Sequence, residues 1–144
     1  MSPGLQISRV WFDDDVIELQ ITVSDGGSCF LCKAYVGHAA LREAVESLDV
    51  FKNQVHGGLL DLRFGEFGPE YANGAFHARF HLLEPGRLFV TCEMETEHED
   101  FARKQVARRA TLFVKSEPAL LDRFIVRMRS LASGADVTAH LEGA

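Results

Sequence analysis

Two cysteines three positions apart, Cys29 and Cys32, form the pattern in this sequence that looks most like a chemical motif. A C-x-x-C pair can hold a metal ion or form a redox disulfide. Here the pair follows the turn-forming run SDGGS and lies in the alternating run CFLCKAYV, which predicts a strand over residues 29–36. Side chains i and i+3 of a strand point to opposite faces, with Cα atoms about 10 Å apart, beyond the reach of a disulfide. We therefore interpret both cysteines as structural thiols and predict no metal and no cofactor.

A row of basic and titratable side chains, His77, Arg79 and His81, alternates with apolar residues along residues 75–83. Three glutamates alternate in the same way between residues 93 and 97. If the connection between the two strands carries a bulge, the two rows face each other as cross-strand ion pairs. The basic row is then either a solvated sheet face or a polar surface that binds an anion or a partner. A metal ion shared by the two histidines is not expected, because they lie about 13 Å apart along a strand.

An acidic run, Asp13-Asp14-Asp15, directly follows Trp11 and Phe12. Carboxylates are ligands for calcium and magnesium. Three consecutive side chains cannot all point at one ion, however, and no glycine-spaced calcium loop follows. We predict a polar turn between two strands, and we expect the two aromatic side chains to pack in the core or at a sheet edge.

The segment ARKQVARR (102–109) is the strongest basic run and hints at nucleic-acid binding. The segment EMETEHED (93–100) stands directly before it and supplies five acidic residues. Adjacent runs of opposite sign are expected to neutralise each other across a sheet. The whole chain carries a net charge of −6, which repels phosphate backbones. The sequence therefore predicts no nucleic-acid partner.

Motifs of common catalytic sites are missing from the sequence: it has no G-x-S-x-G elbow, no phosphate-binding loop and no H-E-x-x-H. Active-site residues that are scattered along a chain leave no such pattern. We therefore assign no catalytic residue. Enzymatic activity stays open, and a non-enzymatic function is the favoured hypothesis.

Hydrophobic periodicity predicts the elements that must position these groups. Strands are expected at 5–12, 16–23, 29–36, 59–64, 75–83, 87–97 and 106–114, and amphipathic helices at 38–51 and 116–134. Residues 135–144 either add a short edge strand or fray. Hairpin turns predict an α+β fold, with one antiparallel sheet of about six to seven strands and both helices on one face, in the order βββα-ββββ-α. A faint similarity between the two strand–helix segments leaves an internal duplication open.

Length and composition are those of one globular domain spanning residues 1–144, with 47% hydrophobic and 25% charged residues. No apolar run is long enough to span a bilayer, and no secretory signal is visible at the N-terminus. Three cysteines, an odd number, favour free thiols in a reducing compartment. We therefore expect a cytoplasmic protein with no membrane partner.

The most distinctive segment is LRFGEFGPEYANGAFHARFHLL (62–83), in which glycine, proline and asparagine surround three aromatic residues. Together with the hairpin sequence ELQITVSDG and the helix start PALLDRF, it resembles certain uncharacterised small bacterial α+β proteins. These are loosely similar to immunity and accessory proteins of toxin or secretion loci, and the resemblance implies protein binding. It implies no activity, no cofactor and no catalytic residue.

Two functions follow from these observations. The leading hypothesis is a non-enzymatic protein-binding module, immunity-like or accessory, that binds a protein partner or self-associates as a homodimer. The alternative is a small-molecule-binding protein or enzyme with a pocket between the sheet and the loop 65–74. Five residues are the candidates for partner or ligand binding: Tyr71, Asn73, His77, Arg79 and His81.

Overall fold

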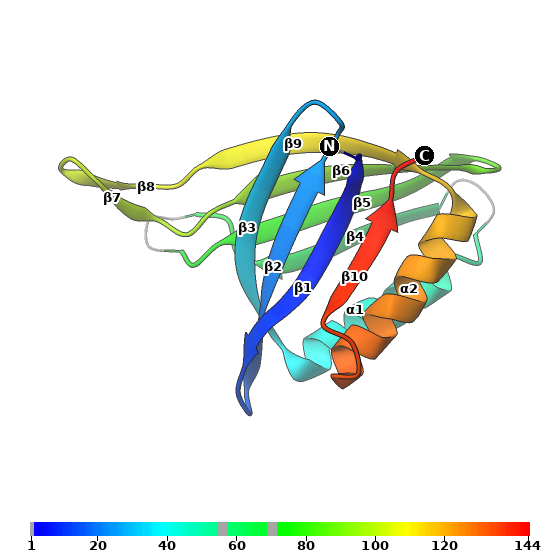
Figure 1. Ribbon diagram of the computed structural model, residues 1–144, viewed down its shortest axis with the longest axis horizontal. Coiled ribbons are helices and arrows are strands. Elements are labelled where there is room, and N and C mark those ends of the chain that lie inside the picture. The colour runs from blue at the N-terminus through cyan, green and yellow to red at the C-terminus, as the bar shows by residue number, and fades with distance from the viewer. Residues whose placement is uncertain (1, 55–57, 69–71) are drawn as a thin grey trace.

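The computed structural model describes residues 2–54, 58–68 and 72–144 and folds them into two antiparallel sheets, a two-stranded hairpin and two helices (Figure 1). Sheet A has the strand order β10 (Thr138–Glu142), β1 (Gly4–Phe12), β2 (Val16–Ser24), β3 (Cys29–Gly37). Sheet B has the order β4 (Gly58–Gly65), β5 (Ala75–Glu84), β6 (Arg87–Glu95), β9 (Arg109–Ser116). The hairpin consists of β7 (Glu99–Phe101) and β8 (Lys104–Val106), and the helices are α1 (His38–Phe51) and α2 (Pro118–Ser133).

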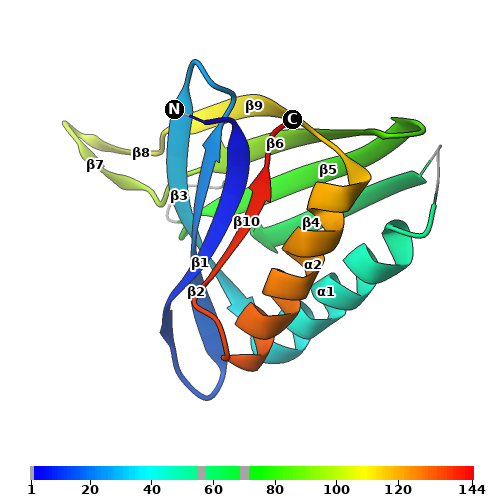
Figure 2. The ribbon, with the colours of Figure 1, turned by 45° about the vertical axis from the view of Figure 1, so that its right-hand side comes forward.

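The α+β class and the antiparallel pairing are confirmed, but the prediction of one sheet of about six to seven strands is wrong, because the strands form two four-stranded sheets and one two-stranded sheet. The two sheets lie face to face with their strands crossing, and the helices lie side by side where the sheets diverge (Figure 2). Eight long strands each bury one apolar face, and helices of 14 and 16 residues cannot cover all of it. The sheets therefore cover each other, and the helices cover the remaining open side.

The core is one cluster that draws on both sheets and both helices. Alternate residues of each long strand point into it, such as Ile17, Leu19 and Ile21 on β2 and Phe76, Ala78 and Phe80 on β5. The prediction of the inward face from alternation is thus confirmed for these strands. The other face of each sheet points away from the core, and in sheet B that face carries the predicted basic row.

Helix termini follow local sequence rules. Helix α1 has the predicted bounds, 38–51. Pro118 stands in the first turn of α2, and Gly134 ends the helix in the left-handed conformation, with φ of 88°, as a glycine C-cap does. Ser116, the first residue of the predicted helix 116–134, instead ends β9, and its hydroxyl donates to the Glu142 carbonyl over 2.6 Å. No helix of the described residues is long and apolar enough to cross a membrane.

The two sheets have equivalent topologies. Helix α1 leads from the edge strand β3 of sheet A to the edge strand β4 of sheet B, and α2 leads from the edge strand β9 of sheet B back to the edge strand β10 of sheet A. Strands β10, β1, β2 and β3 with α1 thereby correspond to β4, β5, β6 and β9 with α2. This arrangement is what an internal duplication would produce, and it includes the two segments whose sequences are faintly similar.

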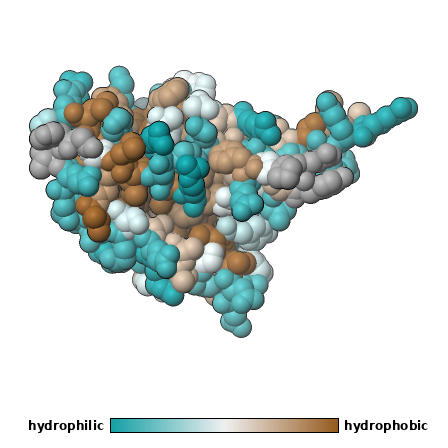
Figure 3. Space-filling view, turned by 180° about the vertical axis from the view of Figure 1, so that it is seen from behind, coloured by the Kyte–Doolittle hydropathy of each residue, from teal (hydrophilic) through white to brown (hydrophobic). Residues whose placement is uncertain are grey.

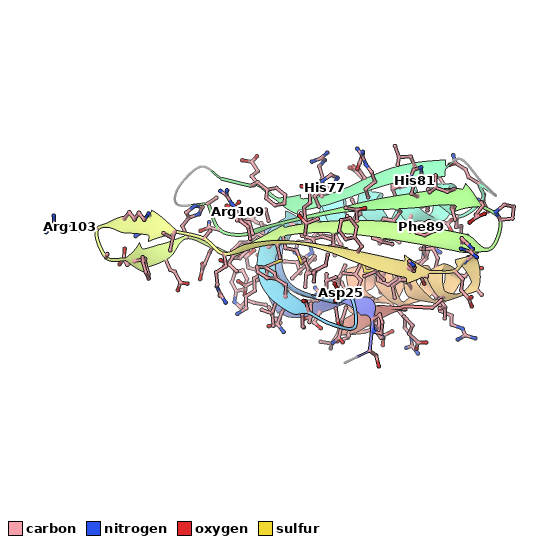
Figure 4. The ribbon with its side chains drawn as sticks, turned by 90° about the horizontal axis from the view of Figure 1, so that it is seen from above. Asp25, His77, His81, Phe89, Arg103 and Arg109 are labelled. Carbon is pink, nitrogen blue, oxygen red and sulfur yellow. The ribbon has the colours of Figure 1, made fainter. Side chains whose placement is uncertain are left out.

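The hairpin β7–β8 projects away from both sheets (Figures 1 and 4). It continues the β6 and β9 ladder: the Thr96 N–H donates to the Arg108 carbonyl over 2.9 Å, and the Arg108 N–H donates to the Thr96 hydroxyl over 2.9 Å. Ala102 turns the chain with a positive φ of 56°. The sequence predicted no strand between residues 98 and 105, so the projecting hairpin is a correction.

Candidate functional site

The outer face of sheet B is covered neither by sheet A nor by the helices, which all lie on the other side of it (Figure 4). Its side chains come from alternate positions of four neighbouring strands. The predicted row His77, Arg79 and His81 lies on this face, as the alternation along β5 requires. Figure 3 looks onto the face and shows polar and apolar side chains in adjacent stripes.

Asp61 of β4 joins two members of the row. Its Oδ1 atom lies 2.7 Å from His77 Nε2 and 2.9 Å from Arg79 Nε, and its Oδ2 atom lies 3.2 Å from an Arg79 terminal nitrogen. The hydrogen bonds from Arg79 and then from His77 lower the pKa of Asp61 from 3.8 to about 2. In return, the hydrogen bond to Asp61 raises the pKa of Arg79. The cluster therefore holds the Arg79 guanidinium in a fixed bidentate geometry.

Strand register decides which residues face each other across this surface. His77 lies opposite Glu93, as expected if the basic and acidic rows meet. Arg79 lies opposite Thr91, and His81 lies opposite Phe89, so the rest of the row meets no carboxylate on β6. A bulge of the kind on which this pairing was conditional lies between His81 and Glu84. The carboxylate that the row binds is Asp61 on the opposite neighbour β4, which the sequence did not single out.

Apolar side chains share the face with this polar cluster. Phe113 of the edge strand β9 is 65% exposed, and Leu59 of β4 is 50% exposed. Phe89 of β6 is half-buried and diagonal to Phe113, because Thr91 is the direct partner of Phe113. Large exposed apolar groups next to bidentate polar groups are typical of surfaces that bind another protein.

A buried carboxylate fixes the loop 65–74 against one end of this face. The Glu95 side chain is 1% exposed, and it accepts hydrogen bonds of 2.9 Å from the Gly68 N–H and of 2.9 Å from Arg109 Nε. His98 Nδ1 lies 3.8 Å from Glu95 and has no hydrogen-bond partner among the described residues. The loop is thereby tied both to β9 and to the base of the hairpin.

A groove of about 590 Å³ runs along the same end of the face. Phe67 and Gly68 of the loop form one wall, and Glu93, Arg109 and Thr111 of the sheet contribute to the floor. The four predicted binding residues that lie in the described ranges, Asn73, His77, Arg79 and His81, do not line it. The groove is open to solvent and lies between these two loop residues and the ends of β6 and β9.

The five predicted residues do not form one site. His77, Arg79 and His81 lie together on the outer face. Asn73 is exposed and lines a separate pocket of about 290 Å³ with Tyr35 and Gly74. Tyr71 lies outside the described residues. Asp61, Glu95 and Arg109 were missed, although alternation along 59–64 would have placed Asp61 on the outer face.

The C-x-x-C pair lies on strand β3 as predicted, with Cys29 exposed and Cys32 buried. Cys32 Sγ contacts the Ala75 carbonyl oxygen at 3.7 Å. Burial raises the pKa of Cys32, and also that of Cys92, to about 12, so both thiols stay protonated. In the part of the chain that the structure describes, no cluster of three or more histidine, cysteine or acidic side chains could hold a metal ion.

The acidic run forms the predicted polar turn. The Asp13 carboxylate accepts hydrogen bonds of 2.8 Å from the N–H groups of Asp15 and Val16, and these bonds lower its pKa. Trp11 and Phe12 are 47% and 59% exposed, so neither packs in the core. Both lie beyond Ser8, the last residue of β1 that pairs with β10, and therefore at a sheet edge, as the alternative expectation had it. A bulge between Arg9 and Trp11 interrupts the pairing of β1 with β2 just before them.

Comparison of the chain with protein-family models, with curated protein sequences and with solved structures finds no match.

Proposed function

We propose that this chain is a protein-binding module and that the outer face of sheet B is its recognition surface. The observation that carries the proposal is the composition of this uncovered face. Leu59 lies beside the fixed Arg79–Asp61 pair, Phe113 lies across Thr91 from Arg79, and both apolar side chains are at least half exposed. Aromatic and arginine side chains are the groups that most often dominate binding energy at protein interfaces. The resemblance to small bacterial accessory and immunity-like proteins, and a cytoplasmic location, remain part of this proposal.

The preformed geometry of the face supports binding. The Arg79 guanidinium already donates two hydrogen bonds to the Asp61 carboxylate, so a partner does not have to order it. Phe113 lies on the same face, across Thr91 from Arg79, on a strand that is hydrogen-bonded to β6 along its whole length. Burying the exposed part of Phe113 would contribute about 1–2 kcal/mol of binding free energy. The partner is either a second copy of this chain or another protein.

Two matched variants test the proposal. Phe113→Glu places a charge in the proposed surface, and Val126→Glu places one on the exposed side of α2, where Val126 is 61% exposed. Both sites tolerate polar side chains, so both variants should keep stability within about 0.5 kcal/mol of the parent. Sedimentation velocity measures self-association, and quantitative affinity enrichment measures other protein partners.

We expect Phe113→Glu to weaken association at least about tenfold, and Val126→Glu to leave it unchanged. If both variants associate as the parent chain does, the outer face of sheet B is not the recognition surface. If the parent chain stays monomeric and enriches nothing that depends on Phe113, the proposed function is wrong.

Small-molecule binding is a second candidate, and the groove beside Phe67 is the observation that favours it. Its floor combines Glu93, Arg109 and Thr111, which offers both a donor and acceptors. A ligand-observed NMR screen with Thr111→Trp as the blocked control would test it. Ligands that bind the parent chain and the blocked variant equally well would exclude the groove as their site.

A further inference from the structure

The chain is strongly basic from the turn of the β7–β8 hairpin to the end of β9, the outermost strand of sheet B. Between residues 101 and 116 the sequence has no aspartate or glutamate, and it carries five of the chain's 15 lysine and arginine residues: Arg103, Lys104, Arg108, Arg109 and Lys115. These residues follow one another along β8 and β9, from the tip of the projecting hairpin to the far end of the sheet (Figure 4). We name this stretch, residues 103–115, the basic edge. It stands in a chain whose net charge is −6.

The backbone of the basic edge has a free side. The hydrogen bond from the Thr96 N–H to the Arg108 carbonyl shows that the backbone groups of Arg108 face β6. The β6–β9 register has no shift from there to Ser116, so the same alternation holds along the whole strand. Backbone groups in an antiparallel pair alternate between facing the neighbour and facing away. The N–H and C=O groups of the odd-numbered residues of β9, from Arg109 to Lys115, therefore face away from β6.

One further bond confirms this phase. The Ala144 N–H donates to the Lys115 carbonyl over 2.8 Å, from the side opposite β6. Within the described residues, the backbone groups of Arg109, Thr111 and Phe113 have no backbone partner on that side. Since β9 is the last strand of sheet B, these groups can accept a further strand.

Charge indicates what kind of strand fits. Of the five cations, Arg109 is the one with an ion-pair partner among the described residues, the buried Glu95. The other four are available to carboxylates of a partner, and the exposed Phe113 offers an apolar contact between them. A nucleic acid is disfavoured, because acidic Glu99 and Asp100 stand on the neighbouring β7 and because a phosphate backbone cannot match alternating donors and acceptors.

We propose that the basic edge binds an extended, acidic segment of a partner protein, which adds to β9 as a fifth strand of sheet B. The main-chain bonds of Arg109, Thr111 and Phe113 give the segment its register. Its carboxylates face the unpaired cations, and one apolar side chain packs on Phe113. This proposal rests on the protein-binding function proposed above and specifies the chemistry of the partner.

The chain itself supplies a probe. Strand β6 already pairs with the inner side of β9, and its Glu93 and Glu95 lie opposite Thr111 and Arg109. A fluorescent peptide of residues 88–96, with serine in place of Cys92, carries the same apolar and acidic alternation. Its affinity for the intact chain is measured by fluorescence anisotropy at physiological salt. Two control peptides carry lysines in place of both glutamates, or N-methyl groups on alternate backbone nitrogens.

Thr111→Pro is the discriminating variant. The Thr111 N–H faces away from β6, so proline removes a donor from the free side and leaves the β6 ladder intact. Thr111→Val keeps the donor and removes only the hydroxyl. We expect the peptide to bind the parent chain and Thr111→Val equally, and Thr111→Pro at least about tenfold more weakly. Both control peptides should also bind at least about tenfold more weakly, and binding should slow amide exchange at Thr111 and Phe113.

Several results would overturn the proposal. These are no saturable binding below about 1 mM, equal binding to Thr111→Pro, or displacement of the peptide by a single-stranded oligonucleotide. If Thr111→Pro does not fold, the N-methylated peptide makes the same test with the protein unchanged. A natural partner that is lost from Phe113→Glu and retained by Thr111→Pro would sustain the protein-binding function and refute strand addition.

Discussion

Replacing Asp61 by asparagine tests the geometry of the polar cluster through its dependence on pH. The folded chain holds the pKa of Asp61 at about 2 instead of 3.8, because Arg79 and His77 donate hydrogen bonds to the carboxylate. The ionised form is therefore favoured by folding. Its stabilisation is fully present above pH 3.8 and is lost as the pH falls towards 2.

The magnitude follows from the shift and from exposure. A fall in pKa from 3.8 to about 2 corresponds to at most about 2.4 kcal/mol. The Asp61 side chain is 30% exposed and Arg79 is 49% exposed, so solvent screens the pair. After this screening we expect the ionised Asp61 carboxylate to contribute about 1 kcal/mol to the free energy of unfolding.

Urea unfolding of the parent chain and of Asp61→Asn, at several pH values between 2 and 6, measures how much the ionised Asp61 carboxylate contributes to the free energy of unfolding. We expect the variant to be less stable by about 1 kcal/mol at pH 5, and the difference to vanish near pH 2. Asp14→Asn, in the exposed β1–β2 turn, controls for the loss of one negative charge. A difference that does not change with pH, or an Asp61 carboxyl that titrates near 3.8 by NMR, would refute the reasoning.

Three further predictions concern the elements that support the face. Arg109→Met should destabilise the fold by about 2 kcal/mol in urea, because it leaves the Glu95 carboxylate buried with one donor fewer. Gly74→Ala should lower the free energy of unfolding by about 2 kcal/mol or more, because Gly74 has a φ of 103° and a Cβ there would overlap a carbonyl of β3. Gly86→Ala should lower it by about 1 kcal/mol, because Gly86 has a φ of 80° but open space around it. Iodoacetamide should label one thiol of the native chain, Cys29, and all three after unfolding, as counted by mass spectrometry.

Each of these predictions has an outcome that contradicts it. Arg108→Met is the control, because Arg108 has no ion-pair partner among the described residues, and it should change stability little. Equal destabilisation by the two arginine variants would show that the buried Glu95 carboxylate does not depend on Arg109. If the two glycine substitutions lower the free energy of unfolding equally, β3 does not pass close to Gly74. Fast labelling of a second thiol would show that Cys32 or Cys92 is accessible in the native state.

Local patterns in the sequence predicted local structure well. Alternation along 16–23 and 75–83 correctly placed Ile21 and Phe80 in the core and Arg79 on the opposite face. Turn residues also adopt the backbone conformations that their types favour: Gly86 has a φ of 80°, as the third residue of a type II turn requires. These features depend on residues close together in the chain, and periodicity reports them directly.

What could not be predicted depends on contacts between distant segments. Periodicity shows which residues share a face but not what covers that face, so the division into two sheets was missed. The hairpin β7–β8 has strands of three residues each and almost no apolar alternation, so no strand pattern marks it. Asp61 joins the basic row through the register of β4 on β5, which is set across the whole loop 65–74.

Site-specific photo-crosslinking tests the central claim most directly. A photoreactive phenylalanine analogue replaces Phe113 in one variant and Val126 in another, and both are irradiated in the cells that produce the protein. The account predicts covalent adducts of defined mass from position 113, with a second copy of the chain or with another protein, and none from position 126. Equal adducts from both positions, or none from position 113, would contradict the claim that the outer face of sheet B is a protein-recognition surface.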